Sequence, residues 1–128
     1  MFKEFTIIIC IILAVIGGNI FSQNYTKNSV EMVTQKIEEL SEILINTDDK
    51  ELMKEKHQDI LDTWESRFKI LAYYIEHDEL EKVKTELVIL GANIEVEEYE
   101  KGLEELEKCK YILEHIEEKE EFSLMNVF

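Results

Sequence analysis

The segment IEHDELEKVKTEL, residues 75–87, recurs nineteen residues further along the chain as IEVEEYEKGLEEL, residues 94–106, with seven of thirteen positions identical. Each copy opens with an aliphatic residue and a glutamate, passes through two further acids, and then starts an amphipathic run. Acidic residues in the first turn of a helix interact favourably with its positive end. Each copy therefore predicts a helix boundary, with Asp78 as N-cap and Glu81 at the N3 position in the first copy. A nineteen-residue period corresponds to one helix and a short turn.

Apolar residues at three-and-four spacing continue on both sides of the repeat and predict four helices in all. The stripes run through Val30, Val33, Ile37, Leu40 and Leu44; through Leu52, His57, Ile60, Trp64, Phe68, Leu71 and Ile75; through Leu80, Val83, Leu87 and Leu90; and through Tyr99, Leu103, Leu106, Leu113 and Ile116. Asn28 is placed to cap the first of these helices, and Asp48 to cap the second after the polar run of residues 46–50. The predicted fold is all-α, an antiparallel bundle of about four helices over residues 29–121.

The composition supports this fold class and narrows the range of partners. The chain of 128 residues has no proline and only four glycines, a mix that favours helix. Its 29 acidic and 14 basic residues give a formal net charge of -15, so nucleic acid and bare anionic lipid headgroups are poor partners. Cys10 lies in an apolar segment and Cys109 near the other end, so the two thiols predict no disulfide.

The N-terminal segment FTIIICIILAVIGGNIF, residues 5–21, holds seventeen residues without a charge. This length is at the short edge of what spans a bilayer core of about 30 Å, and at the long edge of a signal-peptide core. Ile20 and Ser22 give only a mediocre match to a cleavage site, so we interpret residues 5–22 as a transmembrane anchor or an uncleaved signal, with a cleaved signal peptide as the alternative. We expect residues 1–4 to form a short cytoplasmic end and residues 23–28 to form a linker. Because a strongly acidic domain is readily exported, we predict that this domain lies outside the cytoplasm at the cell membrane.

The chain closes with FSLMNVF, residues 122–128, an apolar tail behind a very polar helix end. Its apolar residues are candidates for partner binding: Phe122, Leu124, Met125, Val127 and Phe128. The tail either folds back to close the base of the bundle, or docks on the bilayer or on a membrane partner. Because the helices alternate in direction, the tail and the end of the second helix should both lie on the membrane-proximal side.

Histidines and carboxylates define one alternative site. Glu76, His77 and Asp78 follow the second apolar stripe, and Glu114 and His115 repeat the order of an apolar residue, a glutamate and a histidine. Nitrogen and oxygen donors of this kind suit zinc or manganese. However, no motif with fixed metal-ligand spacing occurs, and a histidine in the last turn of a helix is favoured by the helix dipole. We therefore predict no metal and no cofactor, and keep a cation-binding module built on His77 and His115 as the alternative.

No residue pattern typical of catalysis occurs, so we predict that the protein is not an enzyme. Cys109 falls on the inner stripe of its helix and is expected to be a buried structural thiol. His57 is expected to be a partly buried packing residue and Trp64 part of the core. Tyr73 and Tyr74 are adjacent, so on a helix at least one of them should face solvent or a partner.

Three segments carry a resemblance to a known family: WESRFKILAYYIEHDELEKVKTEL, EYEKGLEELEKCKYILEHIEEKEEFSL and the closing NVF. Together they resemble a family of small membrane-anchored proteins of spore-forming Gram-positive bacteria, catalogued as domain of unknown function 4363. The matching pattern includes Trp64, Glu76, His77 and Asn126. The resemblance implies one anchor and a helical domain outside the cytoplasm, with no assigned activity and no catalytic residues. Members of this family also look like companions of small integral membrane proteins, which implies an accessory subunit.

These observations together predict a single-pass membrane protein that works as a non-enzymatic accessory or interaction subunit. Its partners are expected to be the lipid bilayer, through residues 5–22, and an integral membrane protein that the acidic domain meets outside the cytoplasm. No small-molecule substrate is indicated.

Overall fold

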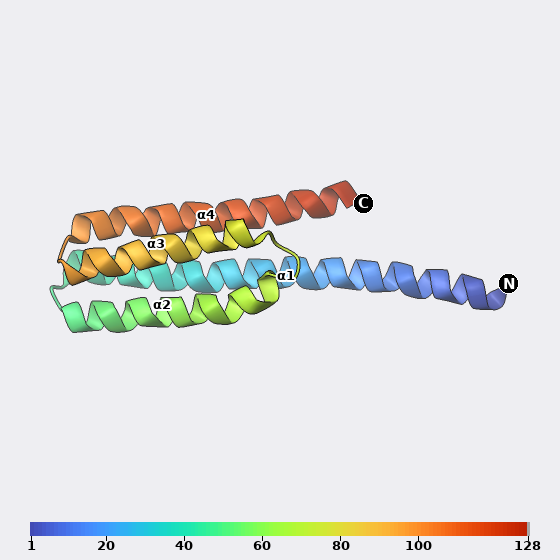
Figure 1. The fold of residues 1–128 in the computed structure, drawn as a ribbon, viewed down its shortest axis with the longest axis horizontal. Coiled ribbons are helices and arrows are strands. Elements are labelled where there is room, and N and C mark those ends of the chain that lie inside the picture. Colours follow the sequence, from blue (N-terminus) through green and yellow to red (C-terminus); the bar gives the residue numbers. More distant parts are fainter. Residues whose placement is uncertain (128) are drawn as a thin grey trace.

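The computed structural model consists of four helices joined by short turns, and it describes residues 1–127, with side chains as far as Phe122. α1 comprises Phe2–Asn46, α2 Lys50–Leu71, α3 His77–Glu95 and α4 Tyr99–Val127. Successive helices run in opposite directions, and α1 and α3 each contact both α2 and α4 (Figure 1). The predicted all-α class and helical bundle are confirmed.

One hydrophobic core fills the centre of the bundle along its whole length. The predicted stripes supply nearly all of it, because residues at three-and-four spacing share one face of a helix. The buried apolar residues are Val30, Val33, Ile37, Leu40, Leu44, Met53, Ile60, Trp64, Leu71, Leu80, Val83, Leu87, Leu90, Ile94, Leu106, Cys109, Leu113 and Ile116. Among the predicted core positions, Trp64 is almost fully buried and His57 is partly buried.

The first helix is continuous from the apolar segment into the bundle, and its 45 residues extend over about 67 Å. The predicted linker over residues 23–28 and the predicted cap at Asn28 are therefore wrong. This polar segment contains neither proline nor glycine, so nothing in it interrupts the helical hydrogen bonds. Thr26 and Ser29 are buried on the same face as Val30 and Val33, which continues the packed stripe through the polar segment.

The three turns differ in detail from the predicted boundaries. α2 ends at Leu71, four residues before the predicted end at Ile75, and α3 begins at His77 with Glu76 as N-cap. Asp78 lies inside the first turn of α3, where it complements the dipole, and the prediction that it caps the helix is wrong. At the start of α2 the cap is Asp49, whose Oδ1 accepts a hydrogen bond from the backbone N–H of Leu52 at 3.1 Å.

The last helix extends through the predicted tail. α4 runs to Val127, so residues 122–127 lengthen the helix and do not turn back across the base of the bundle. No glycine or proline follows Gly102 in this helix, so no residue favours a reversal of the chain. The structure does not describe the side chains of Leu124, Met125 and Val127, and Phe128 lies outside the described residues. The end of α4 and the α2–α3 turn both lie on the side of the bundle from which the N-terminal part of α1 projects (Figure 1).

Candidate functional site

The N-terminal part of α1 is the one described helix that is long and apolar enough to cross a membrane, judged by length and composition. Its most apolar window has a mean hydropathy of 2.4 and buries none of its residues in the bundle. Figure 1 shows this part projecting alone beyond the other helices. Large apolar side chains from Phe5 to Phe21 are therefore exposed on every side of the helix.

Tyr74 joins the α2–α3 turn to the point where this apolar segment ends. Its hydroxyl lies 3.0 Å from the backbone oxygen of Ser22, to which it donates, and 2.8 Å from Oγ1 of Thr26. Burial raises the pKa of the Tyr74 phenol, so it remains a neutral hydrogen-bonding group. Sequence reasoning missed this contact, because Tyr74 lies in a turn and Thr26 in the segment taken as a linker. The spacing of Thr26, four residues before Val30 and therefore on the same helical face, was the signal available in the sequence.

Aromatic side chains gather around the same junction. The rings of Phe21 and Tyr25 stack with their centroids 5.8 Å apart, and the guanidinium of Arg67 lies 5.0 Å from the centroid of the Tyr25 ring. Tyr73 is 88% exposed and Phe122 is 65% exposed at this end of the bundle. The prediction that one of the two adjacent tyrosines faces outward is confirmed, since Tyr73 is exposed and Tyr74 half-buried.

The five residues of the alternative cation site are placed differently from expectation. His77 is the first residue of α3 and not part of the last turn of α2, so it lies at the positive end of a helix dipole. Its ring packs edge-on against Phe68 at 4.9 Å, and Nε2 lies 3.6 Å from the Glu81 carboxylate. Within the described part of the chain, no three His, Cys, Asp or Glu side chains form a group that could hold a metal ion.

The neighbours of Glu76 and Glu79 come from α4. Nζ of Lys119 lies 4.0 Å from the Glu76 carboxylate and 3.8 Å from that of Glu79. These ion pairs tie the start of α3 to the last part of α4. His115 and Glu114 are exposed on α4, and Asp78 is exposed on α3.

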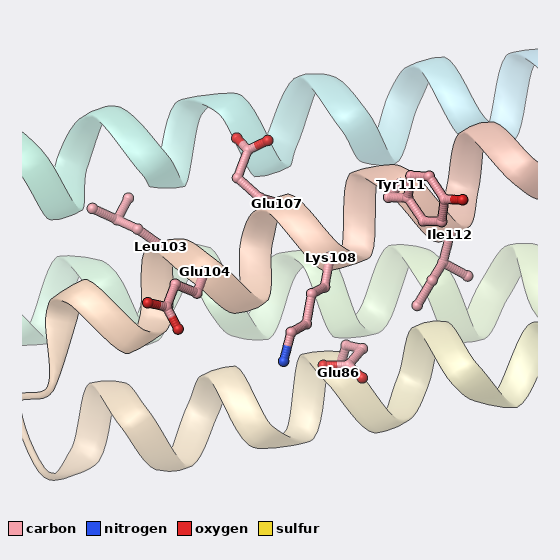
Figure 2. Close-up of a pocket in the computed structure, with 7 residues that line it drawn as sticks. All are labelled: Glu86, Leu103, Glu104, Glu107, Lys108, Tyr111 and Ile112. Carbon is pink, nitrogen blue, oxygen red and sulfur yellow. The ribbon is translucent and has the colours of Figure 1, made fainter.

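A shallow groove of about 610 Å³ lies where the outer face of α4 borders α3 (Figure 2). It combines apolar surface with carboxylates and one lysine, and Tyr111 in it is 72% exposed. In Figure 2, Lys108 reaches from α4 toward Glu86 on α3. The groove is lined by Glu86, Leu103, Glu104, Glu107, Lys108, Tyr111 and Ile112.

Two carboxyl groups meet behind this groove. Oε2 of Glu86 and Oε2 of Glu105 are buried, and neither receives a hydrogen bond from another group in the described part of the chain. The two side chains share a hydrogen bond in which Glu86 holds the proton and Glu105 accepts it. This hydrogen bond is the main reason that the pKa of Glu86 is raised, and burial adds to it. The same hydrogen bond lowers the pKa of Glu105. Nζ of Lys108 lies 3.2 Å from Oε1 of Glu105 and lowers it further.

Cys109 lies next to this carboxyl pair and is buried, as predicted. Its Sγ lies 4.0 Å from the backbone oxygen of Val83. Burial raises the pKa of the thiol to about 12, with a smaller contribution from Glu86 and Glu105, which are both ionised at the high pH where the thiol titrates. A thiol that stays protonated is a poor nucleophile, so Cys109 serves packing.

Comparison with protein families gives a match over nearly all of the bundle. A family model described as "Domain of unknown function (DUF4363)" matches residues 20–127. The chain belongs to the DUF4363 family. No curated protein and no solved structure matches the chain. The DUF4363 match starts at Ile20, ahead of the Tyr74 contact with Ser22, so the family unit includes the junction between the projecting helix and the bundle.

Proposed function

We propose that this DUF4363 protein is a single-pass membrane protein that serves as a non-enzymatic interaction subunit for an integral membrane partner. The continuity of α1 is the observation that carries the proposal. An apolar, fully exposed half leads without a break into a half that is buried in an acidic bundle. A helix of this kind holds the bundle at a defined height and orientation above the bilayer, which suits presentation to a neighbouring membrane protein.

The proposed orientation places the bundle outside the cytoplasm. Lys3 lies directly before the apolar segment, while Lys27 and Lys36 follow it at a distance. Positive residues that flank a membrane span favour the cytoplasmic side, and acidic residues have little effect on translocation. The acidic bundle is therefore compatible with export.

Two surfaces support an interaction role over catalysis. The groove on α4 keeps Leu103, Tyr111 and Ile112 beside carboxylates, and exposed aromatic and apolar residues with a polar rim are typical of protein interfaces. The charged groups that line the groove are carboxylates and one lysine. The Cys109 thiol beside the groove is buried and protonated, so it is a poor nucleophile. The predicted tail at Phe122 supplies a second apolar surface at the membrane-facing end.

Cysteine accessibility tests the proposed orientation. In a Cys10→Ser background, Glu4→Cys and Glu100→Cys place single reactive thiols at the two ends of the molecule, while Cys109 stays buried and Lys3 is kept. A membrane-impermeant maleimide added to intact cells should label the Glu100→Cys variant and leave the Glu4→Cys variant unlabelled until the cells are opened. The reverse pattern would place the bundle in the cytoplasm and contradict the proposal.

Site-specific photo-crosslinking tests the partner. Benzoylphenylalanine is introduced in place of Tyr111 or Glu107, both exposed in the groove on α4, with Val96 as a matched position because it is 64% exposed at the far end of the bundle. After irradiation of native membranes, at least one of the first two positions should give a discrete adduct with an integral membrane protein, and Val96 should not. Absence of any discrete membrane-protein adduct from both positions would overturn the proposal.

A further inference from the structure

We propose that the membrane-facing end of the bundle lies within the interfacial layer of the lipid bilayer, between headgroups and acyl chains. We call this surface the base, defined by Phe21, Tyr25, Tyr73, Tyr74 and Phe122. The occupant of the base is lipid and not a protein. The inference rests on the proposed membrane-spanning role of α1 and adds a second contact between the chain and the bilayer.

The first step is the level of the base relative to the apolar segment. The hydrogen bond from Tyr74 to the Ser22 backbone oxygen places the α2–α3 turn one residue beyond Phe21, where the apolar segment ends. The exposed side chain of Tyr73 belongs to the same turn. With the bilayer core ending at Phe21, where the apolar segment ends, the turn lies at its boundary.

The second step is the length of the apolar segment. Seventeen residues of α-helix extend over about 26 Å, which is less than the hydrocarbon core of about 30 Å. A short span is accommodated by thinning of the bilayer or by drawing its flanking residues toward the core. Because α1 continues into the bundle without a linker, the flanking residues cannot move away from the base. The short span therefore brings the base against the lipid.

The third step is the distribution of aromatic residues. Within residues 5–21 the aromatic side chains are Phe5 and Phe21, one at each end, and every apolar residue between them is aliphatic. At the base, Phe21 is joined by Tyr25, Tyr73 and Phe122. Aromatic residues concentrate at the two membrane–water interfaces, because one part of the ring is apolar and tyrosine also carries a polar tip.

The fourth step is the reach of α4. Gly102 packs near Leu44, and Lys110 pairs with Glu38 at 3.6 Å, so α4 descends alongside α1 in the antiparallel direction. Two antiparallel helices advance at the same rise per residue, which puts the last turn of α4 roughly level with Ser22. Figure 1 shows α4 extending beyond the α2–α3 turn toward the projecting part of α1. The residues that reach this level have the apolar sequence FSLMNV, residues 122–127.

The charge of the bundle decides the class of lipid. Glu76, Asp78 and Glu121 are exposed near the base, so anionic headgroups gain nothing from it. The contact depends on aromatic and aliphatic area, which interfacial layers of zwitterionic lipid accept.

Nitroxide depth measurements on the full chain test the inference. In a Cys10→Ser background, the label is attached to Tyr73→Cys or Ile70→Cys at the α2–α3 end, both at exposed positions. Val96→Cys is the matched aqueous control, and Ile9→Cys reports insertion of the anchor. The protein is reconstituted in phosphatidylcholine vesicles, and the collision rates of each label with oxygen and with a water-soluble nickel chelate are compared.

The expected result is a gradient of depth. The Ile9 label should collide mainly with oxygen, the Val96 label mainly with the nickel chelate, and the Tyr73 and Ile70 labels should show a several-fold lower nickel collision rate than Val96. Nickel collision rates at both Tyr73 and Ile70 equal to that at Val96, with Ile9 deep, would overturn the inference alone. An Ile9 label that is open to the nickel chelate would instead overturn the proposed membrane span.

Discussion

Tyr74 and Thr26 lie 48 residues apart in sequence, and their hydroxyl groups are 2.8 Å apart in the structure. Both hydroxyls also lie within hydrogen-bonding distance of the Ser22 backbone oxygen, at 3.0 and 2.8 Å. This small network connects the α2–α3 turn to α1 at the end of the apolar segment. The apolar segment and the bundle, which are separate features of the sequence, are therefore rigidly connected in the structure.

Replacing Tyr74 with phenylalanine should weaken that connection. Tyr74→Phe removes a hydroxyl that donates to Ser22, and we expect the free energy of unfolding to fall by about 1 kcal/mol. The measurement is unfolding of the full chain in detergent micelles, followed by circular dichroism. Tyr73→Phe is the matched control, because the Tyr73 side chain is exposed. Equal stability of the two variants would show that the network contributes nothing.

Gly91 should not tolerate a side chain. A Cβ atom at this position would lie 2.7 Å from Cε1 and 3.1 Å from Nε2 of His57, whose Nε2 is held 2.7 Å from the Leu87 backbone oxygen. Gly91→Ala is therefore expected to lower the free energy of unfolding by about 1–3 kcal/mol, despite the better helix propensity of alanine.

Gly102 provides the control for that substitution. Its Cβ would meet Leu90 at 3.5 Å and Leu44 at 3.6 Å, which are ordinary packing distances. Gly102→Ala should be neutral or should stabilise the protein by up to about 1 kcal/mol, since alanine is the better helix former. A loss of stability at Gly102 as large as that at Gly91 would mean that the clash with His57 is not the cause.

Cys109 should be unreactive in the folded protein. Burial raises the pKa of its thiol to about 12, so the thiolate is scarce at pH 8 and the sulfur is also shielded. In the Cys10→Ser variant, a thiol reagent should therefore modify no cysteine at pH 8 until the protein is denatured, after which it should modify one. Rapid modification of the folded variant would show that the α3–α4 interface opens readily.

Glu86 should make stability depend on pH. A carboxyl whose pKa is raised by folding contributes stability that is complete below its unfolded pKa and is lost as pH rises through the folded value. Glu86→Gln keeps a hydrogen-bond donor toward Glu105 and removes the charge. We expect it to raise the Tm by about 2 °C near pH 8, corresponding to roughly 0.5 kcal/mol, and to leave the Tm unchanged near pH 4.

Glu107→Gln removes the same charge from an exposed position that lines the same groove. It should change the Tm little at either pH, because an exposed charge interacts weakly. If Glu107→Gln gives the same gain as Glu86→Gln at pH 8, net charge and not the Glu86–Glu105 contact is responsible.

The predictions that succeeded depend on periodicity. Val33, Ile37 and Leu40, or Leu80, Val83 and Leu87, lie on one helical face whatever the neighbouring chain does, so the sequence predicts both the helix and its buried side. The burial of Cys109 follows from the same spacing. The boundaries failed where several residues compete for one role, as Asp48 and Asp49 do before α2, or Glu76 and Asp78 before α3.

The sites were harder to predict because their members come from different helices. Nothing in the local sequence of Tyr74 indicates that its hydroxyl reaches Ser22, and nothing in that of Glu86 indicates that Glu105 opposes it. His77 was read as the end of one helix and is the start of another, which reverses the sign of the dipole that acts on it.

Local patterns in the chain were therefore enough for an acidic all-α protein with one apolar segment, since charge, helix propensity and hydrophobic spacing are properties of neighbouring residues. Whether the polar residues 23–28 separate the anchor from the bundle was decided by packing. Thr26 and Ser29 are buried only because α2, α3 and α4 assemble around α1, and Tyr74 reaches Ser22 only when the α2–α3 turn is in place. Contacts between residues some fifty positions apart exist only in the folded chain, and in this protein they turn a predicted linker into a rigid junction at the point where the apolar segment ends.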